Sequence, residues 1–266
     1  MRKFLQTVSI VVCVLLLCGC SSNDAPDTTP IAKYESIAQM KNAADGVWMD
    51  PNTGTYVVVE NGLLISYDEN NITTQLNKLR RTSLSFEDYC KTFATDCATK
   101  VDYDYTNGYL LNSMNQELVF RVHDAGAAFD QNNTIYLKNS TYVEELEEIL
   151  LDGYVDARYP GIISHKDVQF NKSGTLGQSF LIKGTAILDD YYNWGYRNYE
   201  ASHFCIKIRP VGGSYSDEWT VYASRSEFGE LYDALMNGSR RVYLIAKTEF
   251  ADTGSNNMAT LVNYFS

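Results

Sequence analysis

The chain has 266 residues, of which 45% are hydrophobic and 21% are charged, and its formal net charge is −11. These values exclude a disordered acidic tail, a collagen-like repeat and a multi-span membrane protein, and the length suits one large domain or two small ones. The acidic balance argues against a general nucleic-acid binder, which needs a basic surface.

The N-terminal residues have the pattern of an export signal. Two positive charges follow Met1, and residues 4–19 are almost wholly apolar and carry no charge. As a helix this run would span about 24 Å, which is short of the roughly 30 Å hydrocarbon core of a membrane. The pattern therefore predicts a signal peptide over residues 1–19 and not a permanent membrane helix.

The signal ends in Leu17-Cys18-Gly19-Cys20, which resembles the lipobox of bacterial lipoproteins. In that family the cysteine thiol is diacylglycerated and the peptide is cut just before it, although Ala, Ser, Thr or Val is commoner at the position of Cys18. The resemblance implies that Cys20 is the first mature residue and a lipid anchor on the extracytoplasmic face of the cell membrane or of an outer membrane. The alternative is an ordinary secretory signal that contains cysteines. Residues 20–30 contain two prolines and no large apolar residue, which predicts a flexible tether.

Three cysteines remain beyond the anchor: Cys90, Cys97 and Cys205. Ser85 and the acidic residues after it are typical of a helix start. In a helix over residues 86–96, Cys90 and Cys97 would lie about 10.5 Å apart along the axis, beyond the roughly 7 Å that a disulfide allows. We therefore expect small buried thiols. Without a CxxC or HxxxH spacing or a phosphate-binding glycine loop, we expect neither a metal nor a cofactor.

Most of the acidity lies in the first part of the mature chain. Residues 20–169 hold 11 Lys and Arg against 23 Asp and Glu, whereas residues 170–266 hold 9 against 10. We expect an acidic domain over residues 31–165 with a hairpin-rich α+β fold. Its predicted elements are a helix in 31–44, a type I′ hairpin of 56–60 and 63–67 around Asn61-Gly62, a helix over 86–96, strands in 100–111, 117–122 and 134–137, and a helix over 141–152.

Two local patterns in this domain lead to specific expectations. Thr141 and Glu144 form a capping-box pattern, and Gly153 stands where a C-cap glycine belongs. The predicted core face of that helix is Val143, Leu146, Ile149 and Leu150. Separately, Gly46-Val47-Trp48 resembles the opening of lipocalin-type barrels, but the predicted strands are too few for a full eight-stranded barrel.

The second half predicts a small β domain over residues 170–266. The order of three strands, one helix and two strands is that of an OB-fold, a five-stranded barrel, and the region resembles the OB-type domains of some bacterial lipoproteins. A small sandwich or a mixed sheet is the alternative. The predicted elements are strands at 180–188, 203–209 and 219–222, a helix over 226–237, and strands at 241–246 and 259–264.

The candidate ligand-binding segment is residues 189–202, which joins the first two of these strands. Exposed aromatic rings there would stack on a glycan or offer a protein contact, whereas the alternative is that they cover the end of the barrel. No catalytic motif accompanies the three histidines, His123, His165 and His203. The candidate binding residues are Tyr191, Tyr192, Trp194, Tyr196, Arg197 and Tyr199.

The sequence thus favours a non-enzymatic, membrane-anchored binding or interaction module for glycan or protein ligands, without a nucleic-acid partner. Two alternatives are an envelope-assembly scaffold whose acidic half contacts basic partners, and a carbohydrate-active enzyme.

Overall fold

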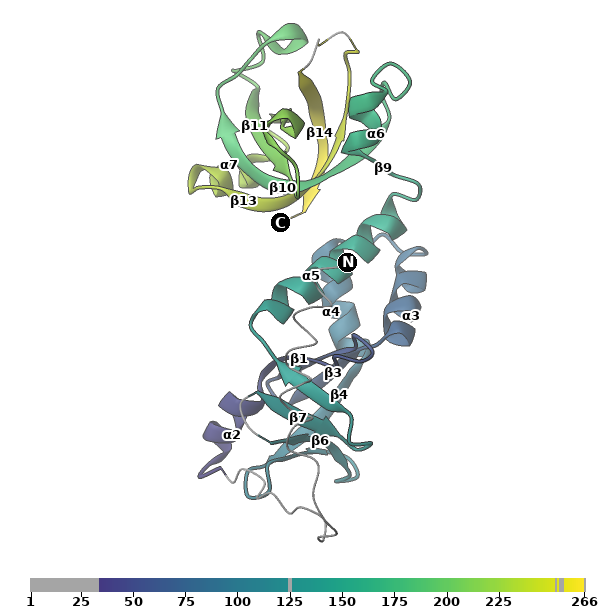
Figure 1. The fold of residues 1–266 in the computed structure, drawn as a ribbon, viewed down its shortest axis with the longest axis vertical. Helices are drawn as coiled ribbons and strands as arrows, with labels where there is room; N and C mark the ends of the chain where they lie inside the picture. Colours follow the sequence, from purple (N-terminus) through teal and green to yellow (C-terminus); the bar gives the residue numbers. More distant parts are fainter. Residues whose placement is uncertain (1–33, 124–125, 252, 254–255, 266) are drawn as a thin grey trace, which may run out of the picture. The chain divides into compact units, whose positions relative to one another are not determined.

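The computed structural model describes residues 34–265 except 124–125, 252 and 254–255 (Figure 1). The expected signal peptide, the lipidated Cys20 and the tether lie outside the described residues.

By its contacts the chain forms two compact units, and both are discontinuous in sequence. The first joins the residues up to Asp68 with Cys97–Val143, and the second joins Glu69–Asp96 with Glu144–Ser266. The second unit therefore includes two segments of the acidic first half.

The first unit is a closed barrel of eight antiparallel strands arranged in sequence order. The ring closes where Trp48 of the first strand pairs with Lys138 of the last. The preceding helix α2 (Ile37–Ala44) is capped by Ser36, whose side chain accepts a hydrogen bond from the backbone of Gln39. The strands are β1 (Gly46–Met49), β2 (Tyr56–Glu60), β3 (Leu63–Tyr67), β4 (Ala98–Asp104), β5 (Tyr109–Asn112), β6 (Leu118–Val122), β7 (Ala127–Asp130) and β8 (Ile135–Lys138).

The interior of this barrel is filled with large side chains. Trp48 is fully buried, donates from Nε1 to the carbonyl oxygen of Ala44 at 2.8 Å, and meets the Phe120 ring edge-on with 5.7 Å between the ring centroids. The strands are only four to seven residues long, so these rings occupy most of the enclosed length. The core is Met40, Ala44, Trp48, Val57, Val59, Leu64, Val101, Leu110, Phe120, Val122, Ala128 and Tyr136.

The expectation that the strands are too few for an eight-stranded barrel is wrong. The β2–β3 turn is as predicted, because Asn61 and Gly62 both have positive φ, at 52° and 78°. Strands β1 and β7, however, have four residues each, which is too short for an alternating pattern to stand out from the surrounding chain.

The first half of the chain contributes helices α3 (Glu69–Leu79), α4 (Phe86–Asp96) and most of α5 (Thr141–Arg158) to the second unit. Figure 1 labels all three. The prediction for residues 86–96 is confirmed, and Cys90, Cys97 and Cys205 form no disulfide. Cys205 is buried as expected, whereas Cys90 and Cys97 are half-buried. Arg158 Nη2 donates to the carbonyl oxygen of Leu84 at 2.6 Å, and Tyr154 donates to the same oxygen at 3.0 Å. These bonds attach the segment between α3 and α4 to α5.

Helix α5 is longer than predicted, and Gly153 is not its C-cap. The helix continues to Arg158 because Leu151, Tyr154 and Val155 extend its buried face. A Cβ at Gly153 would lie 3.1 Å from the Leu76 side chain, so this glycine permits close packing of α5 on α3. The predicted core face is correct for Leu146 and Leu150, whereas Val143 and Ile149 are exposed.

The rest of the second unit is a closed five-stranded ring with short additional elements. Every predicted strand and the predicted helix are present. The strands follow one another around the ring as β10, β11, β12, β14 and β13, and β13 pairs back with β10. Only the β12–β14 pair of this ring is parallel. The elements are β9 (Ile163–Ser164), α6 (His165–Phe170), β10 (Ser179–Asp189), η1 (Trp194–Tyr196), β11 (His203–Pro210), η2 (Tyr215–Asp217), β12 (Trp219–Ser224), α7 (Gly229–Met236), β13 (Arg240–Lys247) and β14 (Asn257–Phe265).

The ring closes around an apolar core. Inward residues of β10, β11 and β12 alternate with outward ones, and α7 adds Leu231 and Leu235 to the core. Gly184 lies in the middle of β10, where a Cβ would overlap the backbone carbonyl of Arg209 on β11. This close approach explains the mid-strand glycine.

Candidate functional site

The aromatic segment 189–202 folds back onto the outer face of the five-stranded ring. Tyr196 is fully buried. Its ring stacks on Tyr222 of β12 with 3.9 Å between centroids, and its hydroxyl lies 2.6 Å from Oγ1 of Thr260 on β14. Burial raises the pKa of Tyr196 far above its ordinary value. Such a ring is a packing element in this arrangement and is not available to a ligand.

The surface beneath this segment explains why it folds back onto the barrel. Cys205, Tyr222 and Met258 point outward from three neighbouring strands and form a second apolar cluster with Tyr196. The backbone carbonyl of Tyr191 accepts hydrogen bonds from the Tyr222 hydroxyl at 2.8 Å and from the Cys205 thiol at 3.3 Å. Covering these rings removes apolar area from water, which favours the closed segment.

Other predicted binding residues of the segment are less deeply placed. Tyr191 is 39% exposed and Arg197 is exposed, with its Nε donating to Asn193 at 3.1 Å. Tyr192 and Tyr199 are half-buried against the cluster. The side chain of Trp194 lies outside what the structure describes. The idea that the aromatic rings project together to solvent is therefore wrong for Tyr196, and the alternative, a cover on the barrel, describes it better.

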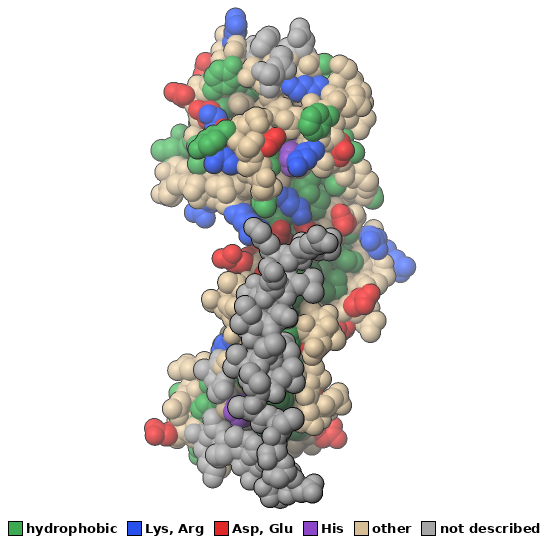
Figure 2. Space-filling model, viewed as in Figure 1, with side chains coloured by type: hydrophobic (Ala, Val, Ile, Leu, Met, Phe, Trp, Pro, Cys, Tyr) green, Lys and Arg blue, Asp and Glu red, His purple; other side chains and the backbone are tan. Residues whose placement is uncertain are grey.

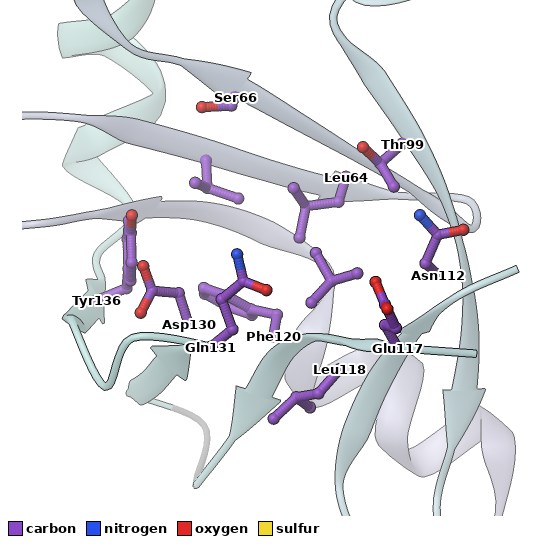
Figure 3. A pocket seen from close by; sticks show the side chains of 12 residues that line it. Leu64, Ser66, Thr99, Asn112, Glu117, Leu118, Phe120, Asp130, Gln131 and Tyr136 are labelled. Atoms are coloured by element: carbon purple, nitrogen blue, oxygen red, sulfur yellow. The ribbon is translucent and has the colours of Figure 1, made fainter. Parts of the chain in front are cut away.

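The first unit holds a different candidate site, a cavity of about 300 Å³ at one end of the eight-stranded barrel (Figure 3). We call it the barrel-mouth cavity. Four side chains of the barrel core, Val57, Leu64, Phe120 and Tyr136, form its apolar part. The remaining lining residues are Ser66, Thr99, Asn112, Glu117, Leu118, Val119, Asp130 and Gln131.

Strand ends and turns hold the polar lining residues in place. Asp130 ends β7, and its Oδ1 accepts the backbone N–H groups of Asn132 at 2.8 Å and Thr134 at 2.9 Å. Glu117 precedes β6, and its Oε2 accepts from Asn115 at 2.8 Å. The second oxygen of each carboxylate accepts no hydrogen bond within the described residues.

The charged residues that line the barrel-mouth cavity are all acidic. Glu117 and Asp130 line it, and no Lys, Arg or His does. Tyr136 is 8% exposed and lines the cavity. Its pKa is raised above the ordinary value, first by burial and then by the negative charges of Asp130, Asp50 and Asp68.

Sequence reasoning missed this cavity because its lining is scattered from residue 57 to residue 136. Only the pairing of β1 with β8 brings these positions together. Single polar residues such as Ser66 and Thr99 carry no signal in the linear chain.

Two further hollows of the second unit are less suited to a ligand. One of about 500 Å³ lies beside β10 and β11, where Arg209 is paired with Glu218 at 2.6 Å and Lys207 with Asp189 at 3.3 Å. These cations are already neutralised by the protein. The other, of about 270 Å³, lies among α4, α5 and β13, where Arg241 is paired with Glu148.

Signs of catalysis and of metal binding are weak in the described part of the chain. Ser202 Oγ lies 2.8 Å from Nδ1 of His203, but no carboxylate is bonded to that histidine among the described residues. Those residues contain no group of three or more His, Cys, Asp or Glu that could hold a metal ion. On the face seen in Figure 2, Lys and Arg of the β10–β14 region are interspersed with Asp and Glu and do not gather in a basic patch.

Within the described residues, every helix is too short or too polar to pass through a membrane. No protein-family model, curated protein or solved structure matches this chain.

Proposed function

We propose that this chain is an extracytoplasmic lipoprotein that binds a small ligand at the mouth of its eight-stranded barrel and carries out no reaction on it. The barrel-mouth cavity carries the proposal. It combines an apolar floor with an equal number of polar lining residues, and the open end of a barrel is a common place for a small-molecule site.

Anchoring through Cys20 is the second part of the proposal. The lipobox Leu17-Cys18-Gly19-Cys20 supports it, since the cysteine of that motif receives the lipid in bacterial lipoproteins. Two acyl chains provide stable membrane attachment where one does not. The protein would then face the outside of the cell membrane or of an outer membrane.

We assign residues 170–266 to an OB-like barrel. The closed five-stranded ring supports this assignment, as does the helix between its third and fourth strands. The first unit has eight strands, so its strand count is compatible with the lipocalin-type barrel whose opening Gly46-Val47-Trp48 resembles. Because side chains fill the interior of both barrels, a ligand can bind only at an end of a barrel or on its outer face.

A glycan or an envelope protein at segment 189–202 is the second candidate, favoured by the exposure of Tyr191 and Arg197. A scaffold role for the acidic half is the third, and we propose neither a nucleic-acid partner nor a carbohydrate-active site. A pull-down from envelope extract separates these possibilities, since acidic scaffolding loses its partner in high salt. Retention on a polysaccharide array that depends on Tyr191 would support the glycan candidate.

Two measurements test the leading proposal. Cys20→Ser should abolish labelling by fatty acid and leave uncleaved precursor, and a variant that is still labelled and cut would refute the anchor. For the cavity, methyl NMR of the chain without its signal peptide, against a library of small molecules, should shift the resonances of Val57 and Leu64. A library that shifts no cavity methyl group would refute the binding site.

A further inference from the structure

We propose that the barrel-mouth cavity selects small organic cations, namely ligands with a primary amine and a compact apolar body. This inference rests on the proposed function and names the class of ligand for the same site.

The first argument is charge. The cavity is lined by Glu117 and Asp130 and by no basic residue. Figure 3 shows Asp130 near Tyr136 and Glu117 near Asn112, so the negative charge is present at two places on the rim. A carboxylate ligand would be repelled by both groups, whereas an ammonium group is attracted.

The second argument is the supply of hydrogen-bond acceptors. One oxygen of Asp130 and one of Glu117 accept no hydrogen bond from the described residues, because Asp130 accepts at Oδ1 and Glu117 at Oε2. The phenol of Tyr136 lines the same cavity and can serve as a further acceptor. An ammonium group offers three donors and no acceptor, which complements this set. A ligand that presents mainly acceptors would leave the carboxylates unpaired.

The third argument is the floor. Phe120 and Tyr136 meet edge to face with 5.3 Å between ring centroids, and Val57 and Leu64 extend the apolar surface. Aromatic faces attract cations, and the aliphatic groups accommodate a hydrocarbon body. The volume of about 300 Å³ is at the small end of ligand sites, which suits a single ring with a short arm.

Three probes of nearly equal size test the inference: benzylamine, benzyl alcohol and benzoate. Each is titrated into the chain without its signal peptide while the methyl resonances of Val57, Leu64 and Leu118 are followed. We expect benzylamine to bind at least about tenfold more tightly than benzyl alcohol, since a hydrogen bond to a charged group is worth that much or more. Benzoate should bind more weakly than the alcohol.

Charge-removing variants show whether the carboxylates are responsible. Glu117→Gln and Asp130→Asn should each weaken benzylamine binding about tenfold and leave benzyl alcohol binding unchanged. The asparagine keeps an acceptor for the backbone of Asn132 and Thr134, so the turn is preserved. Glu60→Gln is the matched control, because Glu60 is exposed at the β2–β3 turn and does not line the cavity.

The outcomes distinguish failure of the cation preference from failure of the binding site itself. If the alcohol or benzoate shifts the cavity methyl groups as strongly as the amine, the site stands and the preference for cations is refuted. If Glu60→Gln weakens amine binding as much as Glu117→Gln, the effect is only net charge, and the inference is refuted. If none of the probes shifts these methyl groups, both the inference and the proposed site fall.

Discussion

Replacing Tyr196 by alanine should destabilise the second unit strongly, because this ring is the centre of the packing on the outer face of the five-stranded ring. Tyr196 has no exposed surface. Besides stacking on Tyr222, it meets Tyr199 and Phe250 edge-on with centroid distances of 5.2 Å and 5.4 Å. A smaller side chain would leave three aromatic neighbours around a void.

The magnitude follows from the contacts. Truncation of a buried aromatic side chain to alanine costs about 3–5 kcal/mol in free energy of unfolding. The hydrogen bond between the Tyr196 hydroxyl and Thr260 Oγ1 contributes about 1 kcal/mol, so Tyr196→Phe should cost only that amount. For a domain of 150–250 residues, a loss of about 4 kcal/mol lowers Tm by roughly 8–16 °C.

Urea unfolding followed by circular dichroism, with a parallel calorimetric scan, measures both quantities. Tyr191→Ala is the matched control, since it removes a partly exposed ring from the same segment and should cost less than about 1 kcal/mol. Equal and small losses for Tyr196→Ala and Tyr191→Ala would refute the packed arrangement. Segment 189–202 would then be free to present its aromatic rings to a ligand.

Three further outcomes are expected. Gly184→Ala should destabilise the five-stranded ring by more than about 2 kcal/mol in urea unfolding, because its methyl group would overlap the Arg209 carbonyl, whereas Gly229→Ala, which meets nothing within 4 Å, should be neutral or stabilising. Burial, and then the charge of Lys166, lowers the pKa of His165, so the unfolded chain takes up protons first. Stability should therefore fall as the pH drops below about 6.5, less steeply in His165→Asn; an unchanged slope would contradict this. Burial raises the pKa of Cys90 to about 11 and that of Cys205 to about 12. Mass spectrometry should thus find buried Cys205 unmodified by iodoacetamide at pH 8 until urea unfolds the chain, and half-buried Cys90 labelled only slowly; rapid labelling of either thiol in the folded protein would refute this.

The elements that could be predicted from sequence are those with a strong local pattern. Strands β10 to β14 are long or densely apolar and end at turn residues, and Asn61-Gly62 requires a specific turn geometry. The sequence pattern ends helix α5 too early, at Gly153. A glycine that ends a helix cannot be told apart in sequence from a glycine that makes room for a neighbouring side chain, here that of Leu76. Packing between segments far apart decides which of the two applies.

The same limit holds for both candidate sites. The sequence of segment 189–202 is compatible both with a loop that projects into solvent and with one that folds back onto the barrel. The second arrangement forms because Cys205, Tyr222 and Met258 point outward and provide an apolar surface for it. The barrel-mouth cavity depends on ring closure between Trp48 and Lys138, a pairing across ninety positions of sequence that no local pattern specifies.

The discontinuous second unit has a consequence for the order of folding. Helices α3 and α4 leave the ribosome between two strands of the first barrel, yet the Phe86 ring packs against Phe265 at the far end of the chain, with 6.5 Å between centroids. Their apolar faces must wait until the segment that holds Phe265 has been synthesised, and such long-range contacts are slow to form. Until then the exposed apolar faces of these two helices make the chain prone to aggregation, the condition in which chaperones act. A fragment that starts at residue 170 would lack α4 and α5, and would leave Tyr243 and Ile245 on β13 without the side chains of Leu151 and Val155 that cover them.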